Sequence, residues 1–360
     1  MSLATPAWAR TFALLASATL LHCGSSPSNE PVTPTAPEPI KVTANTWTWV
    51  DVPDAVCDDG SPTGIGVNFN SSSDLLIFLN GGGACWDLTT CFIANTATHG
   101  PFGSAQFGAL TASGVLTGSV LDRAAPNPFG NFNMAYMPYC TGDLHGGDAV
   151  VAYGTSGSQR VMNFKGRVNM ASYLKRLAAT FPTARKVVVS GISAGGYGVM
   201  LNYDLVHSYF PKSKLYLLDD SGPTLIGDAI IPQERAAWFG AWNLTSTQGS
   251  VCPTCLGDLS ALPKALAAKY PTDRMALLSY TQDGTIQKYL NQDATQFQAN
   301  LYDFAAKRLD LMPLFHYYFV TGTSHTFLLK PGVITAQGIP LWTWLTQFVN
   351  DDAAWTSTKP

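Results

Sequence analysis

Charged side chains are scarce in this chain of 360 residues, since only 12% are Asp, Glu, Lys or Arg, about half the usual globular share of roughly 25%. The 21 basic and 24 acidic residues give a formal net charge of −3. Without a basic excess to neutralise phosphates, nucleic-acid binding is excluded as the main activity. A hydrophobic fraction of 46%, with 32 glycines and 23 prolines, excludes wholesale disorder and indicates a folded protein rich in loops.

A long apolar run is lacking at the N-terminus, where Thr11–Leu21 is too short to span a bilayer but has the length of a signal-peptide h-region. The segment 20–23 (LLHC) is similar to the bacterial lipobox, although His22 stands where a small residue is usual. We therefore expect residues 1–22 to be a signal peptide and Cys23 to be lipidated, with plain secretion as the alternative. Either route exports the protein, as an outer-membrane or cell-surface lipoprotein or as a secreted protein, and the lipid is the only membrane attachment expected.

Residues 23–44 are rich in Pro, Ser, Thr and Glu, a composition that cannot bury a core and predicts an extended linker. No second low-complexity segment and no repeat follow. Residues 45–360 are therefore expected to form a single domain, which we expect to be monomeric.

Seven cysteines leave six once Cys23 is set aside, and an exported chain favours three disulfides over free thiols. Fifteen pairings are open in principle. Spacing suggests the local bridges Cys85–Cys91 and Cys252–Cys255, which leave Cys57 with Cys140. The chain lacks a second CxxC or a histidine cluster at ligand spacing, so no metal site is expected.

Apolar runs of strand length alternate with helix-like segments along the domain. The expected strands lack polar alternation, as is typical of strands buried on both faces of a parallel sheet; they are Leu75–Leu79, Met134–Met137, Lys186–Ser190, Leu215–Leu218, Met275–Tyr280 and His316–Val320. The expected helices are Val168–Phe181, Tyr197–Ser208, Leu259–Tyr270 and Gln296–Leu309. This alternation predicts an α/β fold with a mostly parallel central sheet and helices on both faces. Ligands should bind at the carboxyl ends of its strands.

A G-x-S-x-G motif, Gly191 to Gly195, lies between an expected strand and an expected helix, the context of a nucleophile elbow. In such a turn Ser193 is presented at the edge of the sheet, and the amide of Ala194 points to where an oxyanion would form. A structural turn without chemistry is the alternative.

A nucleophilic serine needs a base, and His325 follows the last expected strand in a polar loop. The chain order serine, acid, histidine is that of α/β-hydrolases. Asp283 is the favoured acid because it closely follows a strand, and Asp219 and Asp220 are its competitors. The remaining histidines are interpreted as packing or surface residues, except that no partner can be named for His99 and that His145 could line the substrate cleft.

Three glycines, Gly81 to Gly83, follow the first buried strand and would let backbone approach a ligand closely. Neither a P-loop nor G-x-G-x-x-G is present, so phosphate binding is not supported and an NAD-dependent oxidoreductase is an unlikely rival.

These pieces occur in the order found in the pectin acetylesterase/Notum family of carboxylesterases, which the chain resembles and of which we expect it to be a bacterial member. The shared pieces are the Gly-Gly-Gly loop with Cys85, the segment 138–148 (PYCTGDLHGGD), GISAGG, Asp219 to Gly222, Asp283 and His325. The resemblance implies an α/β-hydrolase-like fold and a triad of Ser193, Asp283 and His325. It also implies an oxyanion hole of Gly82, Gly83 and Ala194.

The sequence departs from the family in the first loop, where Asn80 and Ala84 replace Glu and Trp and Trp86 follows the cysteine. These departures concern the acyl pocket, so Trp86 and His145 are only candidates for the substrate cleft. The resemblance implies a serine esterase without cofactor, acting on an ester and most simply an acetylated polysaccharide. A hydrolase of longer acyl esters and a non-catalytic surface binding protein are the alternatives.

Overall fold

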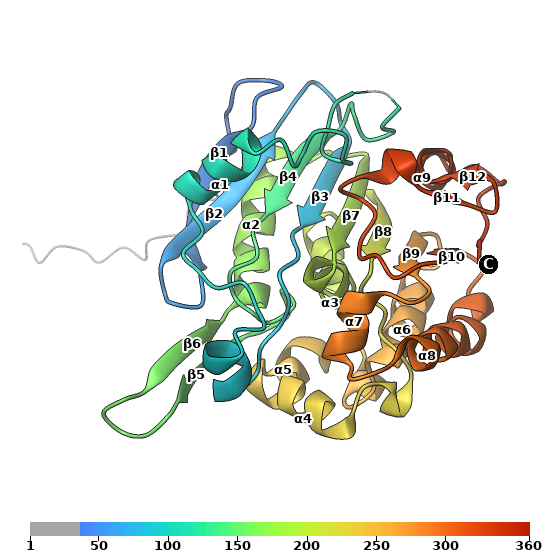
Figure 1. Cartoon of the computed structure of the whole chain (residues 1–360). Helices are drawn as coiled ribbons and strands as arrows, with labels where there is room; N and C mark the ends of the chain where they lie inside the picture. The colour runs from blue at the N-terminus through green and yellow to red at the C-terminus, as the bar shows by residue number, and fades with distance from the viewer. Residues whose placement is uncertain (1–36, 125) are drawn as a thin grey trace, which may run out of the picture. The chain divides into compact units, whose positions relative to one another are not determined.

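The computed structural model describes residues 37–124 and 126–360, and the expected signal peptide and Cys23 lie outside them. Eight strands form the central sheet in the order β1-β2-β4-β3-β7-β8-β9-β10 (Figure 1). Their bounds are β1 Thr48–Val56, β2 Pro62–Asn68, β3 Leu75–Leu79, β4 Asn133–Met137, β7 Lys186–Ile192, β8 Lys214–Asp220, β9 Arg274–Tyr280 and β10 Phe315–Val320. The six strands from β4 to β10 pair in parallel, and β1 and β2 add an antiparallel edge. The mostly parallel sheet is thereby confirmed.

Helices cover both faces of this sheet. They are α1 Ser104–Ala112, α2 Gly166–Thr180, α3 Ala194–Tyr209, α4 Pro232–Ala241, α5 Leu244–Gln248, α6 Leu262–Lys269, α7 Gly284–Tyr289, α8 Ala294–Lys307 and α9 Leu341–Val349. Strand β3 shows how one apolar run serves both faces. Leu75, Ile77 and Leu79 belong to a core cluster with residues of α2, α3 and α8, whereas Leu76 and Phe78 belong to a second cluster with residues of α1 and α9. Because both faces are buried, the strand needs no polar alternation.

Strand β1 was not predicted, and its sequence explains why. Pro53 and two aspartates interrupt its apolar pattern. In the structure it is an edge strand whose register shifts between Asp51 and Val56, and edges and bulges are where a sheet tolerates proline. Two small antiparallel pairs lie outside the main sheet, β5 Ala149–Tyr153 with β6 Arg160–Phe164 and β11 Thr335–Ala336 with β12 Ile339–Pro340.

The packed domain begins earlier than the composition suggested. Ile40 is buried in the core cluster, and its backbone N–H donates to Thr180 Oγ1 at the end of α2. Residues 40–44 were expected to belong to the linker, so the composition placed the linker's end a few residues too late. A single buried isoleucine among prolines and threonines carries no periodic signal that would mark this boundary.

The carboxyl ends of the parallel strands share one edge of the sheet. Strands β3 and β7 are neighbours there although more than 100 residues separate them, and β4 and β8 flank them. The segments that follow β3, β7, β9 and β10 carry the predicted site residues, so the topology brings these segments to the same edge. Among the described residues, no helix is long and apolar enough to cross a membrane.

Candidate active site

The turn at Ser193 is a sharp strand-to-helix connection between β7 and α3. Ser193 has φ 57° and ψ −121°, a backbone conformation that non-glycine residues rarely adopt. Its N–H donates to Asp220 O at 2.7 Å, which ties the turn to the end of β8. A Cβ on Gly195 would lie 2.1 Å from Leu79 O, and one on Gly191 would lie 2.3 Å from Gly195 O. Only glycine fits at these positions, as the motif predicted.

His325 and Asp283 are brought together from the loops after β10 and β9. His325 Nδ1 lies 2.7 Å from Asp283 Oδ2, and Asp283 is fully buried. The other carboxylate oxygen of Asp283 accepts the backbone N–H groups of Thr285 and Ile286 at the start of α7, both at 3.0 Å. The carboxylate of Asp283 is therefore held by the start of α7 and by the imidazole. Its contact with Nδ1 orients the ring so that Nε2 points away from Asp283.

The second ring nitrogen, His325 Nε2, is buried and has no hydrogen-bond partner within the described part of the chain. A buried polar atom without a partner is costly and uncommon in native structures. With Nδ1 engaged by Asp283, Nε2 is left as the free atom that can accept a proton. This is the state that a general base requires.

The competing acids have other partners. Asp220 Oδ2 accepts the N–H groups of Phe327 and Leu328 at 2.7 and 2.8 Å, and burial raises the pKa of Asp220 to about 6. Asp219 Oδ1 accepts the N–H of Gly222, and burial raises the pKa of Asp219 well above its usual value. Asp220 thus holds the loop that carries the histidine, whereas Asp283 holds the ring itself.

The glycine loop after β3 lies against the serine turn. A Cβ on Gly81 would lie 2.9 Å from Ser193 Cβ, so only a residue without a side chain allows this approach. Gly83 has φ +75°, in the left-handed region that favours glycine. Ala194 is the first residue of α3, where amides have no acceptor within the helix. The predicted oxyanion-hole residues Gly82, Gly83 and Ala194 therefore lie on two segments that meet beside Ser193.

A small pocket of about 30 Å³ opens at Ser193. Its walls come from the glycine loop, the start of α3, helix α4 and helix α7. The lining residues are mostly apolar: Gly83, Ala84, Leu144, Ser193, Ala194, Tyr197, Trp238, Ile286, Tyr289 and Leu290. The sequence reasoning missed Trp238 and the three residues of the α7 region, since nothing in their local pattern distinguishes a pocket wall from core packing.

The two residues suggested for the substrate cleft lie outside the pocket wall. Trp86 is half-buried and packs against Trp238, with ring centroids 5.7 Å apart. His145 is 3% exposed, and its Nε2 lies 2.9 Å from Asn80 O beneath the glycine loop. The suggestion that His145 lines the cleft is corrected, because its ring is used to support backbone. Burial lowers the pKa of His145 to about 4.

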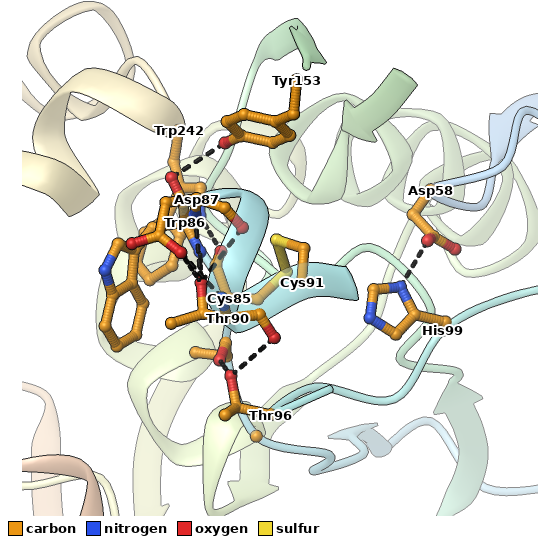
Figure 2. Close-up of a disulfide and its surroundings, with 12 residues drawn as sticks. Asp58, Cys85, Trp86, Asp87, Thr90, Cys91, Thr96, His99, Tyr153 and Trp242 are labelled. Atoms are coloured by element: carbon orange, nitrogen blue, oxygen red, sulfur yellow. Dashed lines mark hydrogen bonds and ion pairs between the residues drawn. A yellow bond between two sulfur atoms is a disulfide. The ribbon is translucent and has the colours of Figure 1, made fainter. Parts of the chain in front are cut away.

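Three disulfides join the pairs that spacing suggested: Cys57–Cys140, Cys85–Cys91 and Cys252–Cys255. Figure 2 shows the Cys85–Cys91 disulfide, which joins two cysteines six positions apart in the sequence, directly after the glycine loop. Tyr139 OH donates to Gly83 O at 2.8 Å, so the segment beside Cys140 also braces this loop. No group of three or more metal-ligating side chains occurs in residues 37–124 and 126–360.

The sheet order and the positions of serine, aspartate and histidine define an α/β-hydrolase-like fold. The solved structure of the Wnt deacylase Notum from Drosophila shares it, with a TM-score of 0.59 and 18% identity over 86% of this chain and 94% of that chain. The chain belongs to the Pectinacetylesterase family, whose model matches residues 39–278.

Two relatives extend the comparison. Palmitoleoyl-protein carboxylesterase notum1' of Xenopus laevis is 31% identical over 175 residues, which cover 46% of this chain and 34% of that protein. Palmitoleoyl-protein carboxylesterase NOTUM of Homo sapiens is 29% identical over 174 residues, which cover 46% of this chain and 34% of that protein. The matched region thus spans about a third of the length of these relatives.

Proposed function

We propose that this protein is an exported serine carboxylic-ester hydrolase that works through an acyl-enzyme. The observation that carries the proposal is the contact of His325 Nδ1 with the buried Asp283, which leaves Nε2 without a partner, while Ser193 occupies a strained turn at the same sheet edge. Membership of the Pectinacetylesterase family supports the same reaction class. Neither a metal nor an organic cofactor takes part.

In the first half-reaction, Ser193 Oγ attacks the ester carbonyl carbon while its proton passes to His325 Nε2. The bond between carbonyl carbon and alcohol oxygen then breaks, and His325 gives that proton to the departing alcohol. In the second half-reaction, a water attacks the acyl-serine with its proton taken by His325. The acid leaves and the proton returns to Ser193. Asp283 orients the imidazole and stabilises its protonated form in both halves.

The tetrahedral intermediates carry a negative oxygen, and we assign its stabilisation to the amides of Gly82, Gly83 and Ala194. Backbone donors held in a pocket that is largely closed to water stabilise such charge strongly, and losing one donor typically costs about 10²–10³ in kcat. The location of Gly83 and Ala194 in the wall of the pocket that contains Ser193 supports this assignment.

For the substrate we propose a short acyl ester, most simply an acetylated polysaccharide. The cavity beside Ser193 has a volume of only about 30 Å³, far below the roughly 300–1,000 Å³ of ligand sites, and this small volume favours a short acyl group. The test is kcat/KM for p-nitrophenyl esters of rising chain length, together with acetate release from acetylated pectin and xylan. A preference for long chains would instead support a lipase-like hydrolase of longer acyl esters.

The mechanism is tested by hydrolysis of p-nitrophenyl acetate by the wild-type protein and by Ser193→Ala. The matched control is Ser208→Ala, an exposed serine near the other end of helix α3. We expect Ser193→Ala to lose all but a residual activity while Ser208→Ala keeps the wild-type rate. Equal rates for wild type and Ser193→Ala would overturn the mechanism and favour a non-catalytic binding protein.

Export and lipidation are part of the proposal. Three disulfides support an oxidising compartment. We propose that residues 1–22 are removed and that Cys23 carries the lipid of an outer-membrane or cell-surface lipoprotein. Incorporation of radiolabelled palmitate into wild type but not into Cys23→Ser is the expected result. A soluble extracellular product without label would favour plain secretion.

A further inference from the structure

The glycine loop is supported from behind by the segment 96–100. Each residue of Gly82–Ala84 is joined to this segment, and the contacts are Thr98 N–H to Gly82 O at 2.6 Å, a strand-like bridge between Gly83 and Ala97, and Thr96 Oγ1 to Ala84 O at 2.6 Å. In a planar trans peptide the carbonyl and the following N–H point in opposite directions. Fixing the carbonyl of Gly82 on the segment therefore directs the N–H of Gly83 away from it.

The end of the segment is held by a buried carboxylate. His99 Nδ1 lies 2.6 Å from Asp58 Oδ2 (Figure 2). The N–H of Gly100 donates to Asp58 Oδ1, also at 2.6 Å. Asp58 is 4% exposed and is itself fixed, because its N–H donates to Cys140 O beside the Cys57–Cys140 disulfide. The pair therefore anchors the segment to a braced part of the domain.

The same hydrogen bond affects the protonation of the imidazole. It raises the pKa of His99 above its ordinary value in spite of burial. The other ring nitrogen, His99 Nε2, is buried and has no hydrogen-bond partner among the described residues. A protonated His99 is thus held by its attraction to Asp58.

We propose that Asp58 and His99 form a positioning pair for ester hydrolysis, holding the segment 96–100 so that the amides of Gly82 and Gly83 stay in place for the oxyanion. This inference rests on the proposed function. The pair touches no reacting atom and acts only through the segment. It is a second histidine–aspartate pair, distinct from the His325–Asp283 pair, and it belongs to a histidine for which the sequence offered no partner.

Other groups around His99 bear on its protonation. Asp59 lies close by, since its Oδ1 would be 3.2 Å from a Cβ on Gly100. Phe92 stacks on the His99 ring at 6.1 Å between centroids and carries the guanidinium of Arg160 on its ring. Burial above all raises the pKa of Tyr139, and the charge of Asp58 adds slightly to this, so Tyr139 stays neutral beside the pair. Of these groups, Asp58 carries the charge that favours protonated His99.

The pair predicts an alkaline limb in the pH profile of kcat. As His99 loses its proton, the charge attraction between its ring and the Asp58 carboxylate is lost and the segment is held less firmly.

The test compares His99→Gln with His207→Gln in hydrolysis of p-nitrophenyl acetate. His207 is the matched control because its Nε2 lies 2.6 Å from Asp273 Oδ2, a pair of the same chemistry remote from the serine turn. We expect His99→Gln to lower kcat by about tenfold with KM little changed, because loosening donors costs less than the roughly 10²–10³ for removing one. The alkaline limb should disappear in His99→Gln and persist in His207→Gln. Full kcat and an intact alkaline limb in folded His99→Gln would overturn the proposal.

A second variant covers a failure of His99→Gln to fold. Asp58→Asn removes the charge that favours protonated His99, so the alkaline limb should move to lower pH. A limb that stays in place would contradict the pair. A trifluoromethyl ketone forms a tetrahedral adduct with serine. Its affinity should fall in His99→Gln and Asp58→Asn by about the same factor as kcat.

Ser193→Ala is measured alongside, which keeps the two proposals separate. Retained activity in Ser193→Ala contradicts the proposed function itself. An inactive Ser193→Ala together with a wild-type profile for His99→Gln and Asp58→Asn contradicts only the positioning pair.

Discussion

The carboxylate of Asp220 accepts the backbone N–H of Phe327 at 2.7 Å, two residues beyond His325. Asp220 closes β8, and its own backbone carbonyl accepts the N–H of Ser193. One residue therefore ties the serine turn to the loop that carries the histidine. This explains why an acid that holds no imidazole is buried at the centre of the site.

Replacing Asp220 by Asn should lower activity through this connection. The amide oxygen of Asn can still accept the two backbone N–H groups, but a neutral acceptor binds them more weakly than a carboxylate. We expect kcat for p-nitrophenyl acetate to fall by about tenfold with little change in KM, since small displacements of catalytic groups cost up to about 10² in rate. A kcat within a factor of two of wild type would show that the histidine loop does not depend on this carboxylate.

Substitution of the two candidate triad acids should have very different effects on kcat. Asp283→Asn keeps the shape of the side chain but favours the wrong imidazole tautomer, and kcat should drop by about 10⁴. In Asp219→Asn, the amide resembles the protonated carboxyl that burial favours, so most of the wild-type kcat should remain. Steady-state kinetics of both variants decide between them. A large loss in Asp219→Asn with a small one in Asp283→Asn would reverse the assignment.

The acid stability of the protein should depend on His145. Burial lowers its pKa from 6.5 to about 4, so between these values the unfolded chain binds a proton that the folded chain does not. The contribution of neutral His145 to the free energy of unfolding is complete above pH 6.5. It is lost as the pH falls towards 4, a change of about 3 kcal/mol. In His145→Gln, the amide can still donate to Asn80 O but does not titrate. Urea unfolding from pH 7 to 4 should therefore show that the free energy of unfolding declines less steeply in His145→Gln than in wild type. Equal declines in the two proteins would contradict a buried neutral His145.

The buried strands and the serine turn could be predicted because their signals are local. The run Leu75–Leu79 is apolar throughout, and the glycines at 191 and 195 flank the serine in a recognisable motif, although the backbone that Gly195 must approach belongs to β3. The residues alone favoured Asp283 over Asp219 without deciding between them. Asp219 lies at the end of β8 and Asp283 just after β9, at the same sheet edge, and the path of the loop after β10 brings the imidazole to Asp283.

The pocket wall and the pair of Asp58 and His99 could not be predicted from the sequence, for a different reason. Trp238 lines the pocket at Ser193 from α4, an element whose place depends on tertiary packing. Asp58 and His99 are 41 residues apart, and neither lies in a motif. A contact between two isolated polar residues has no periodicity, so only the folded chain reveals it.

The acyl-chain preference should depend on Trp238. It forms part of the pocket wall and is 3% exposed, so Trp238→Ala would lengthen the space available to an acyl chain. We expect the ratio of kcat/KM for p-nitrophenyl octanoate to that for acetate to rise by at least about tenfold, since each methylene that a pocket accommodates changes discrimination by roughly 10–200-fold. Trp86→Ala is the matched control, because that indole packs behind Trp238 without lining the pocket, and its ratio should stay near wild type. An unchanged ratio in Trp238→Ala would mean that the acyl group binds elsewhere. An equal rise in Trp238→Ala and Trp86→Ala would mean that loosening of the aromatic cluster, and not the pocket wall, sets the acyl-chain preference.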